Sequence, residues 1–237
     1  MPQVTDLWIA KDGTTSTNNQ PIFSPPKVVT GPVLGGLQTF YVIFGTGKFL
    51  ESGDKTSTAQ NSIYAIYDDG KTTLNQSDTA TLASTIPSVI TGRSRLQAGT
   101  LDTSAKTITV SAFFWGRPMT DTATSSDTST GSTVTLPLKS GWYFDLPASG
   151  EKMISNFLDL SPQVTFNTII PGAAGASGSC TATPGSGNQY VVTIATGNGG
   201  YTVSTVGLLG ASLYIDTDSG TSSVSSSDST GRRTRRT

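Results

Sequence analysis

A glycine-rich tetrapeptide, Gly45-Thr46-Gly47-Lys48, follows an apolar run and is the first candidate for a chemical site. Such loops bind phosphate where their backbone N–H groups and a lysine surround the anion at the start of a helix. Here the full spacing of a phosphate-binding loop is missing, and no helical pattern follows. We therefore interpret the tetrapeptide as a turn that ends a strand.

Two pairs of carboxylates suggest acid–base chemistry, because a glycosidase needs two acids on opposite sides of the bond that it cleaves. The pairs are Glu51 with Asp54 and Asp68 with Asp69. Both pairs stand in polar segments, which favours solvated loop residues. We therefore predict no catalytic residue.

The scarcity of histidine and cysteine further limits the reactions and metal sites that this chain could support. The 237 residues include no histidine, which removes the commonest acid–base group at neutral pH and the commonest transition-metal ligand. Cys180 is the only cysteine, so a disulfide within the chain and a multi-cysteine metal site are excluded. We interpret Cys180 as an incidental loop residue, with an intermolecular disulfide as the alternative. No metal or cofactor-binding residue is predicted.

The charge of the chain argues against polyanionic partners. Its formal net charge is −1 and 13% of its residues are charged, so bulk electrostatic binding to nucleic acid or to an anionic membrane is not expected. Arg232, Arg233, Arg235 and Arg236 follow a serine-rich segment without interleaved aromatic residues, which is typical of a solvated tail. No apolar run is long enough to span a bilayer, and the first residues lack a signal-peptide pattern.

Strand patterns dominate the chain. Residues 40–44 and 62–67 are apolar and aromatic runs that predict an antiparallel pair of strands, with the first buried on both faces. The polar segment 101–106 predicts the turn of a second pair, whereas the Ser/Thr/Asp segment 120–132 predicts a mobile loop. A single helical turn is expected at 77–82. Further strands are expected at 28–29, 88–91, 107–114, 133–136, 141–147, 151–154, 164–170, 190–195 and 210–215.

These strands fall into about three units of roughly 40–50 residues, each ending near an aromatic or apolar residue and an aspartate. The pattern predicts an all-β fold, a modified β-propeller with about three blades in an open or incomplete ring; a β-sandwich is the alternative. Residues 1–33 are expected to form a connector with short strands, and residues 34–220 the C-terminal part of the propeller domain. Residues 221–237 are expected to form a serine-rich, basic, flexible tail.

Three aromatic residues, Trp115, Trp142 and Tyr143, suit a recognition surface because they supply contact area at low entropic cost. The same residues also suit the cores of the predicted blades, and this second interpretation is preferred.

Several ordered blocks resemble the C-terminal domain of the PilC/PilY family of type IV pilus tip-associated adhesins. The first block is Phe44–Glu51 followed by Ser62–Asp68, and the second is Gly141–Lys152 followed by Val164–Pro171. The ending Gly231-Arg232-Arg233 is also similar. The resemblance covers most of residues 20–233.

The resemblance implies a non-enzymatic, modified β-propeller outside the cell, at the pilus tip or outer membrane. It implies roles in pilus assembly, in the control of retraction and in adhesion, with minor pilins, other tip proteins and surface or host receptors as partners. The calcium loop of the family is not found, because Asp216-Thr217-Asp218-Ser219-Gly220 has two carboxylates but no third or terminal ligand.

Two alternatives remain. Propellers often carry glycosidases or quinoprotein dehydrogenases, and an enzyme of that kind would use acids such as Glu51 and Asp145. A structural subunit that assembles through unpaired sheet edges is the second alternative.

Overall fold

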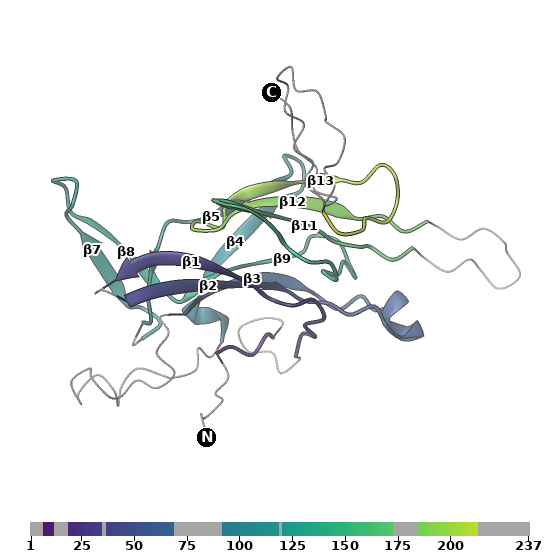
Figure 1. Ribbon diagram of the computed structural model, residues 1–237, viewed down its shortest axis with the longest axis horizontal. Helices are drawn as coiled ribbons and strands as arrows, with labels where there is room; N and C mark the ends of the chain where they lie inside the picture. The colour runs from purple at the N-terminus through teal and green to yellow at the C-terminus, as the bar shows by residue number, and fades with distance from the viewer. Residues whose placement is uncertain are drawn as a thin grey trace, which may run out of the picture.

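A computed structural model describes residues 7–11, 19–34, 37–68, 92–118, 120–172 and 184–212 of the chain (Figure 1). The fold of this part is all-β, as predicted, with two short 3-10 turns, η1 (Ser52–Lys55) and η2 (Arg93–Arg95). No helix in these ranges has the length and apolar character needed to cross a membrane.

Ten strands form one large sheet in the order β1-β2-β3-β9-β4-β5-β13-β12-β11-β10. Their bounds are β1 Lys27–Leu34, β2 Leu37–Gly45, β3 Ser62–Asp68, β4 Gln97–Asp102, β5 Thr107–Val110, β9 Gly141–Asp145, β10 Leu158–Leu160, β11 Gln163–Asn167, β12 Asn188–Thr193 and β13 Gly199–Val203. The sheet curls strongly, so that β11, β12 and β13 lie across from β1, β2 and β3 in Figure 1. Its concave side encloses the core.

The central strands pair as predicted, but burial on both faces describes β3 better than β2, in which Phe40 and Val42 are half-buried. β2 and β3 pair antiparallel from Phe40 opposite Asp68 to Gly45 opposite Ile63. All but the last residue of β3 are buried, because side chains of other segments pack against both of its faces. One face meets the main core, and the other meets a smaller cluster that includes Ala10 and Leu96.

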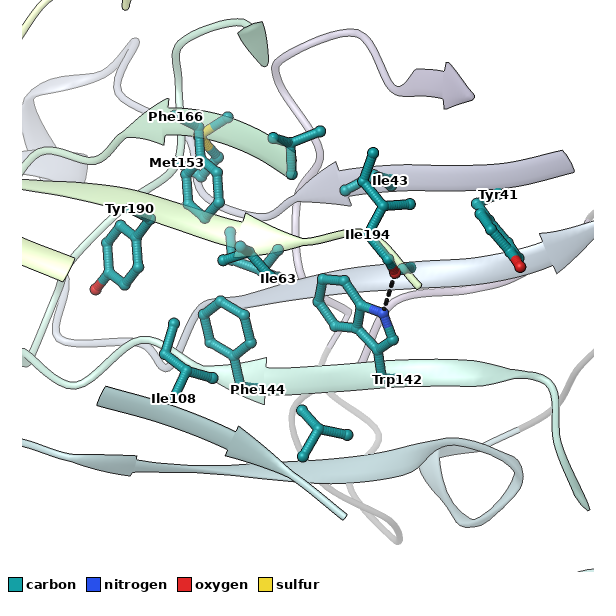
Figure 2. Close-up of a cluster of buried hydrophobic side chains, with 14 of the residues drawn as sticks. Tyr41, Ile43, Ile63, Ile108, Trp142, Phe144, Met153, Phe166, Tyr190 and Ile194 are labelled. Atoms are coloured by element: carbon teal, nitrogen blue, oxygen red, sulfur yellow. Dashed lines mark hydrogen bonds between the residues drawn. The ribbon is translucent and has the colours of Figure 1, made fainter. Parts of the chain in front are cut away.

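The main core joins both halves of the curled sheet (Figure 2). Trp142 and Phe144 of β9 are fully buried at its centre, and the Trp142 indole donates a hydrogen bond to the Ile194 carbonyl at 2.9 Å. Phe166 and Tyr190 stack at a centroid distance of 4.9 Å on the opposite side. Burial of large aromatic rings of this kind is the main source of stability in such a sheet.

A second sheet has three strands in the order β6-β8-β7, with bounds Phe114–Trp115, Val134–Lys139 and Thr124–Asp127. The prediction of a loop over 120–132 is wrong for β7, which pairs antiparallel with β8. Composition does not predict this strand, because pairing of the backbone with β8 orders it. Most of its side chains are exposed.

Other predicted elements had mixed outcomes. Residues 103–106 form the turn between β4 and β5, and β1 covers the strand expected at 28–29. The strand expected at 151–154 is reduced to one bridge, Lys152 with Ile169. The helical turn at 77–82, the strand at 88–91 and most of 210–215 lie outside the described residues. The predicted units are not separated by sheet boundaries, because β9 pairs with both β3 and β4; the blade count and the propeller stay predictions.

Candidate functional site

The tetrapeptide Gly45-Thr46-Gly47-Lys48 lies where β2 ends, at Gly45, as predicted. Its two central backbone donors are already used, since the Thr46 N–H donates to the Ser62 carbonyl at 2.9 Å and the Gly47 N–H to the Pro21 carbonyl at 2.7 Å. Gly47 has φ +128 and packs against Lys152, where a Cβ atom would lie 2.8 Å from the lysine Cβ. These groups therefore form a fixed turn and leave no cradle for phosphate.

The next segment, residues 48–56, is a short loop around η1, which projects from one end of the molecule (Figure 1). Asp54 is buried and its carboxylate accepts hydrogen bonds from the backbone N–H groups of Leu50 and Glu51, each at 2.9 Å. These two bonds hold the pKa of Asp54 below its usual range, and Lys48, at 3.5 Å, adds to the effect. The prediction of solvated loop residues is therefore wrong for Asp54, which caps the loop from inside because two backbone donors compensate for its burial. It holds for Glu51, whose side chain is 72% exposed.

Two consecutive buried residues, Glu151 and Lys152, hold the end of this loop in place through hydrogen bonds. Lys152 is 2% exposed and its ammonium group donates to the carbonyls of Ser57 and Gly150 at 3.2 and 2.8 Å. Desolvation lowers the pKa of Lys152. The Asn61 amide donates to the Glu151 carbonyl at 2.7 Å, which ties the end of the loop to the same segment.

The Glu151 carboxylate, 1% exposed, lies on the core side of that segment. Its Oε1 accepts hydrogen bonds from the Asn188 amide at 3.0 Å, the Tyr190 hydroxyl at 2.8 Å and the Thr168 hydroxyl. Burial, and then the neighbouring Glu151 charge, raise the pKa of Tyr190 well above its ordinary value. A buried carboxylate with several donors is a structural anchor, because leaving it unpaired would be costly.

The loop so anchored and the neighbouring segment before β1 both expose apolar side chains. Phe49 and Leu50 are 38% and 68% exposed, and Ile22 and Phe23 are 48% and 49% exposed. A parallel bridge places Ile22 beside Gly47, two residues before Phe49. We call these four residues the apolar loop surface. Exposed apolar groups on a preorganised loop are typical of protein–protein contact sites.

A second buried polar network surrounds Arg93, which sequence reasoning did not single out. Its guanidinium donates to the Tyr64 hydroxyl at 2.7 and 3.0 Å and to the Ser62 hydroxyl at 2.7 Å, and it pairs with Asp145 at 3.0 Å. The guanidinium also lies 4.5 Å from the centroid of the Tyr143 ring. Asp145, which with Glu51 was an acid of the enzyme alternative, is therefore engaged in an ion pair. No sequence pattern marks an arginine in a short turn before a β-strand as the centre of a buried polar network.

The aromatic candidates divide between the core and its margin. Trp142 is fully buried and Tyr143 lies over Arg93, so both serve the interior of the fold. Trp115 is half-buried, with its ring 4.4 Å from that of Tyr41 and its indole N–H on the Ala195 carbonyl at 2.8 Å. The core interpretation holds for Trp142, and Trp115 joins the two sheets.

The remaining candidates are less informative. Asp68 ends β3 and lies 4.0 Å from Arg117. Within the described ranges, no three acidic, cysteine or histidine side chains gather into a metal-binding group. Asp69, Cys180, the segment 216–220 and the arginines at 232, 233, 235 and 236 lie outside those ranges.

Comparison with known proteins identifies a distant relative. The chain is 29% identical over 185 residues, or 75% of its length, to a protein of Xylella fastidiosa strain Temecula1 named "Type IV pilus biogenesis factor PilY1 homolog". The aligned region spans 10% of that protein. No family model matches the chain, and no solved structure matches it.

Proposed function

We propose that this chain is part of a type IV pilus biogenesis factor and acts through protein–protein contacts rather than catalysis. Two findings support the proposal: the similarity to a protein named as such a factor, and the apolar loop surface. The loop surface carries more weight for mechanism, because it offers apolar contact area without requiring the loop to become ordered on binding.

The partners that we propose are minor pilins or other pilus tip proteins, which bind the apolar loop surface. In this proposal the chain lies outside the cell, at the pilus tip or outer membrane, and supports assembly, retraction control and adhesion to surfaces or host cells. We further propose that its curled sheet is the C-terminal part of a modified β-propeller domain within a longer protein.

The test replaces two exposed residues of the loop surface, Phe49→Ser with Leu50→Asp, in the chromosomal gene. We expect reduced copurification with minor pilins and reduced piliation and twitching, at unchanged protein level. The matched control is Val206→Asp, which places the same charge at a residue that is 84% exposed and distant in sequence. Normal piliation, twitching and adhesion in cells that lack the gene would overturn the proposal.

A further inference from the structure

The hairpin of β7 and β8 forms an arm that extends away from the curled sheet (Figure 1). Three of the four residues of β7 are exposed, and in β8 Val134 is 44% exposed. The Ser126 and Thr135 hydroxyls meet across the hairpin at 3.0 Å, also in an exposed position. β6 pairs with β8 only at Leu138 and Lys139, so the outer part of the arm is a two-stranded ribbon. Such a ribbon is marginally stable in water, so a further strand would stabilise it.

In the described part of the chain, the second sheet has two edge strands, and β6 has only 2 residues, which leaves β7 as its regular free edge. It stands at the end of its sheet and contains neither glycine nor proline. At the edges of the large sheet, β1 has a register shift between Thr30 and Val33, at Gly31-Pro32, and β10 has 3 residues. Bulges, prolines and short strands are features that block pairing at an edge.

The register of the arm shows which backbone groups of β7 face outward. The Leu138 N–H donates to the Ala123 carbonyl at 2.8 Å, so Ala123 faces β8. Thr124 lies opposite Pro137, which has no N–H to share. Because the hydrogen-bonding direction alternates along an antiparallel strand, Thr124 and Ser126 direct their backbone groups to the free edge.

We propose that two copies of this chain associate through β7, in antiparallel pairing about a two-fold axis at Ser125. Thr124 then lies opposite Ser126 of the second copy, and the outward backbone groups of both are satisfied. This inference is independent of the role in pilus biogenesis.

The register makes β7 complementary to itself, and its charge does not oppose a second copy at this edge. Asp127 is the only ionisable residue of β7. The two-fold axis places it opposite the uncharged Ala123 of the second copy, so no like charges meet. A strand of 4 residues buries far less than the roughly 800 Å² per partner of a standard interface, so the association is weak and depends on concentration.

Cysteine cross-linking detects weak pairing of this kind. In a Cys180→Ser background, Ser125→Cys places two thiols opposite each other in a pair without backbone hydrogen bonds, where side chains are closest. We expect a disulfide dimer under mild oxidation, forming at least ten times faster than for Ser129→Cys. Ser129 is the matched control because it lies in the turn of the same arm and is more exposed than Ser125, so accessibility alone would favour the control.

A second substitution tests the edge itself. Ser126→Pro removes an outward N–H and leaves the backbone bonds to β8 intact, whereas Ser126→Ala keeps that N–H. Both substitutions remove the hydroxyl contact with Thr135, so the alanine variant controls for its loss. Added to the Ser125→Cys protein, the proline should slow cross-linking about tenfold and the alanine should leave it unchanged, with identical circular dichroism spectra. Equal cross-linking at positions 125 and 129, or no effect of the proline, would overturn the proposal.

Discussion

Lys27 on β1 and Asp159 on β10 form an ion pair at 3.3 Å, although these two strands are the opposite edges of the ten-stranded sheet. The curl of the sheet therefore brings its two edges close enough for side chains to join them. Among the described strands, no backbone ladder closes the seam between these edges. Both charges are about one-third exposed, so the pair contributes roughly 0.2–1 kcal/mol and is weakened by salt.

The first prediction concerns this seam. Lys27→Met or Asp159→Asn should lower the free energy of unfolding by less than about 1 kcal/mol but increase amide hydrogen exchange in β1 and β10. High salt should have the same effect on the wild type. Lys55→Met removes a charge from η1 and should leave both strands unchanged. Unchanged exchange in both seam variants would show that the ion pair does not hold the seam.

The second prediction concerns the alkaline stability that Tyr64 confers. Burial raises its pKa to about 12 from 10.0, although the positive charge of Arg93 acts in the opposite direction. The unfolded chain therefore loses this proton first, so the contribution is complete below pH 10.0 and is lost as the pH rises to about 12. Denaturation at several pH values should show a smaller alkaline loss for Tyr64→Phe, and equal losses would contradict the assignment.

The third prediction concerns the buried carboxylate of Glu151. Tyr190→Phe removes one of its donors and should cost about 1.5–3 kcal/mol, because hydrogen bonds to charged groups are the strong ones. In a Glu151→Gln background the same change should cost less, and urea denaturation of the four proteins measures the coupling. Tyr201→Phe alters a ring stacked on Tyr190 without removing one of these donors, and serves as the control. If the double substitution costs as much free energy of unfolding as the two single substitutions together, Tyr190 and Glu151 are not coupled.

Sequence reasoning predicted those parts of the fold that local patterns determine. The aromatic run at Tyr64 and its partner strand at Phe44 were found because side-chain period and turn residues are local. The order of the sheet was not predictable in this way, since β9 inserts between β3 and β4 through pairings distant in sequence. β7 was missed because backbone hydrogen bonds, which composition does not reveal, order it.

The candidate site was predictable only in part. The pattern predicts the turn after Gly45 correctly, because glycines that end an apolar run are a local signal. It predicts solvated loop residues at Glu51 and Asp54, which is wrong for the buried Asp54. The burial of Glu151 and Lys152, two charged residues in succession, contradicts what composition suggests and depends on partners from distant segments. Burial of such groups can be read only from the folded chain.

The last prediction concerns the pH dependence of the apolar loop surface. The pKa of Asp54 is depressed because the N–H groups of Glu51 and Leu50 donate to its carboxylate. A depressed pKa means that this carboxylate stabilises the loop above its ordinary pKa of 3.8, and that the contribution is lost as the pH falls through the lower folded value. The amide signals of Leu50 and Glu51 in NMR spectra should therefore titrate with a midpoint below 3.8.

Asp54→Asn should abolish that titration, because the neutral amide is a poorer acceptor for two backbone donors. It should also weaken the proposed binding of minor pilins at neutral pH. Asp102→Asn is the matched control, since Asp102 caps the β4–β5 turn through the N–H groups of Ala105 and Ser104. It should leave the loop signals and partner binding unchanged. If Asp54→Asn keeps full binding while its loop amides exchange faster, the apolar side chains bind without a preformed loop, and the preorganisation argued from Asp54 is wrong.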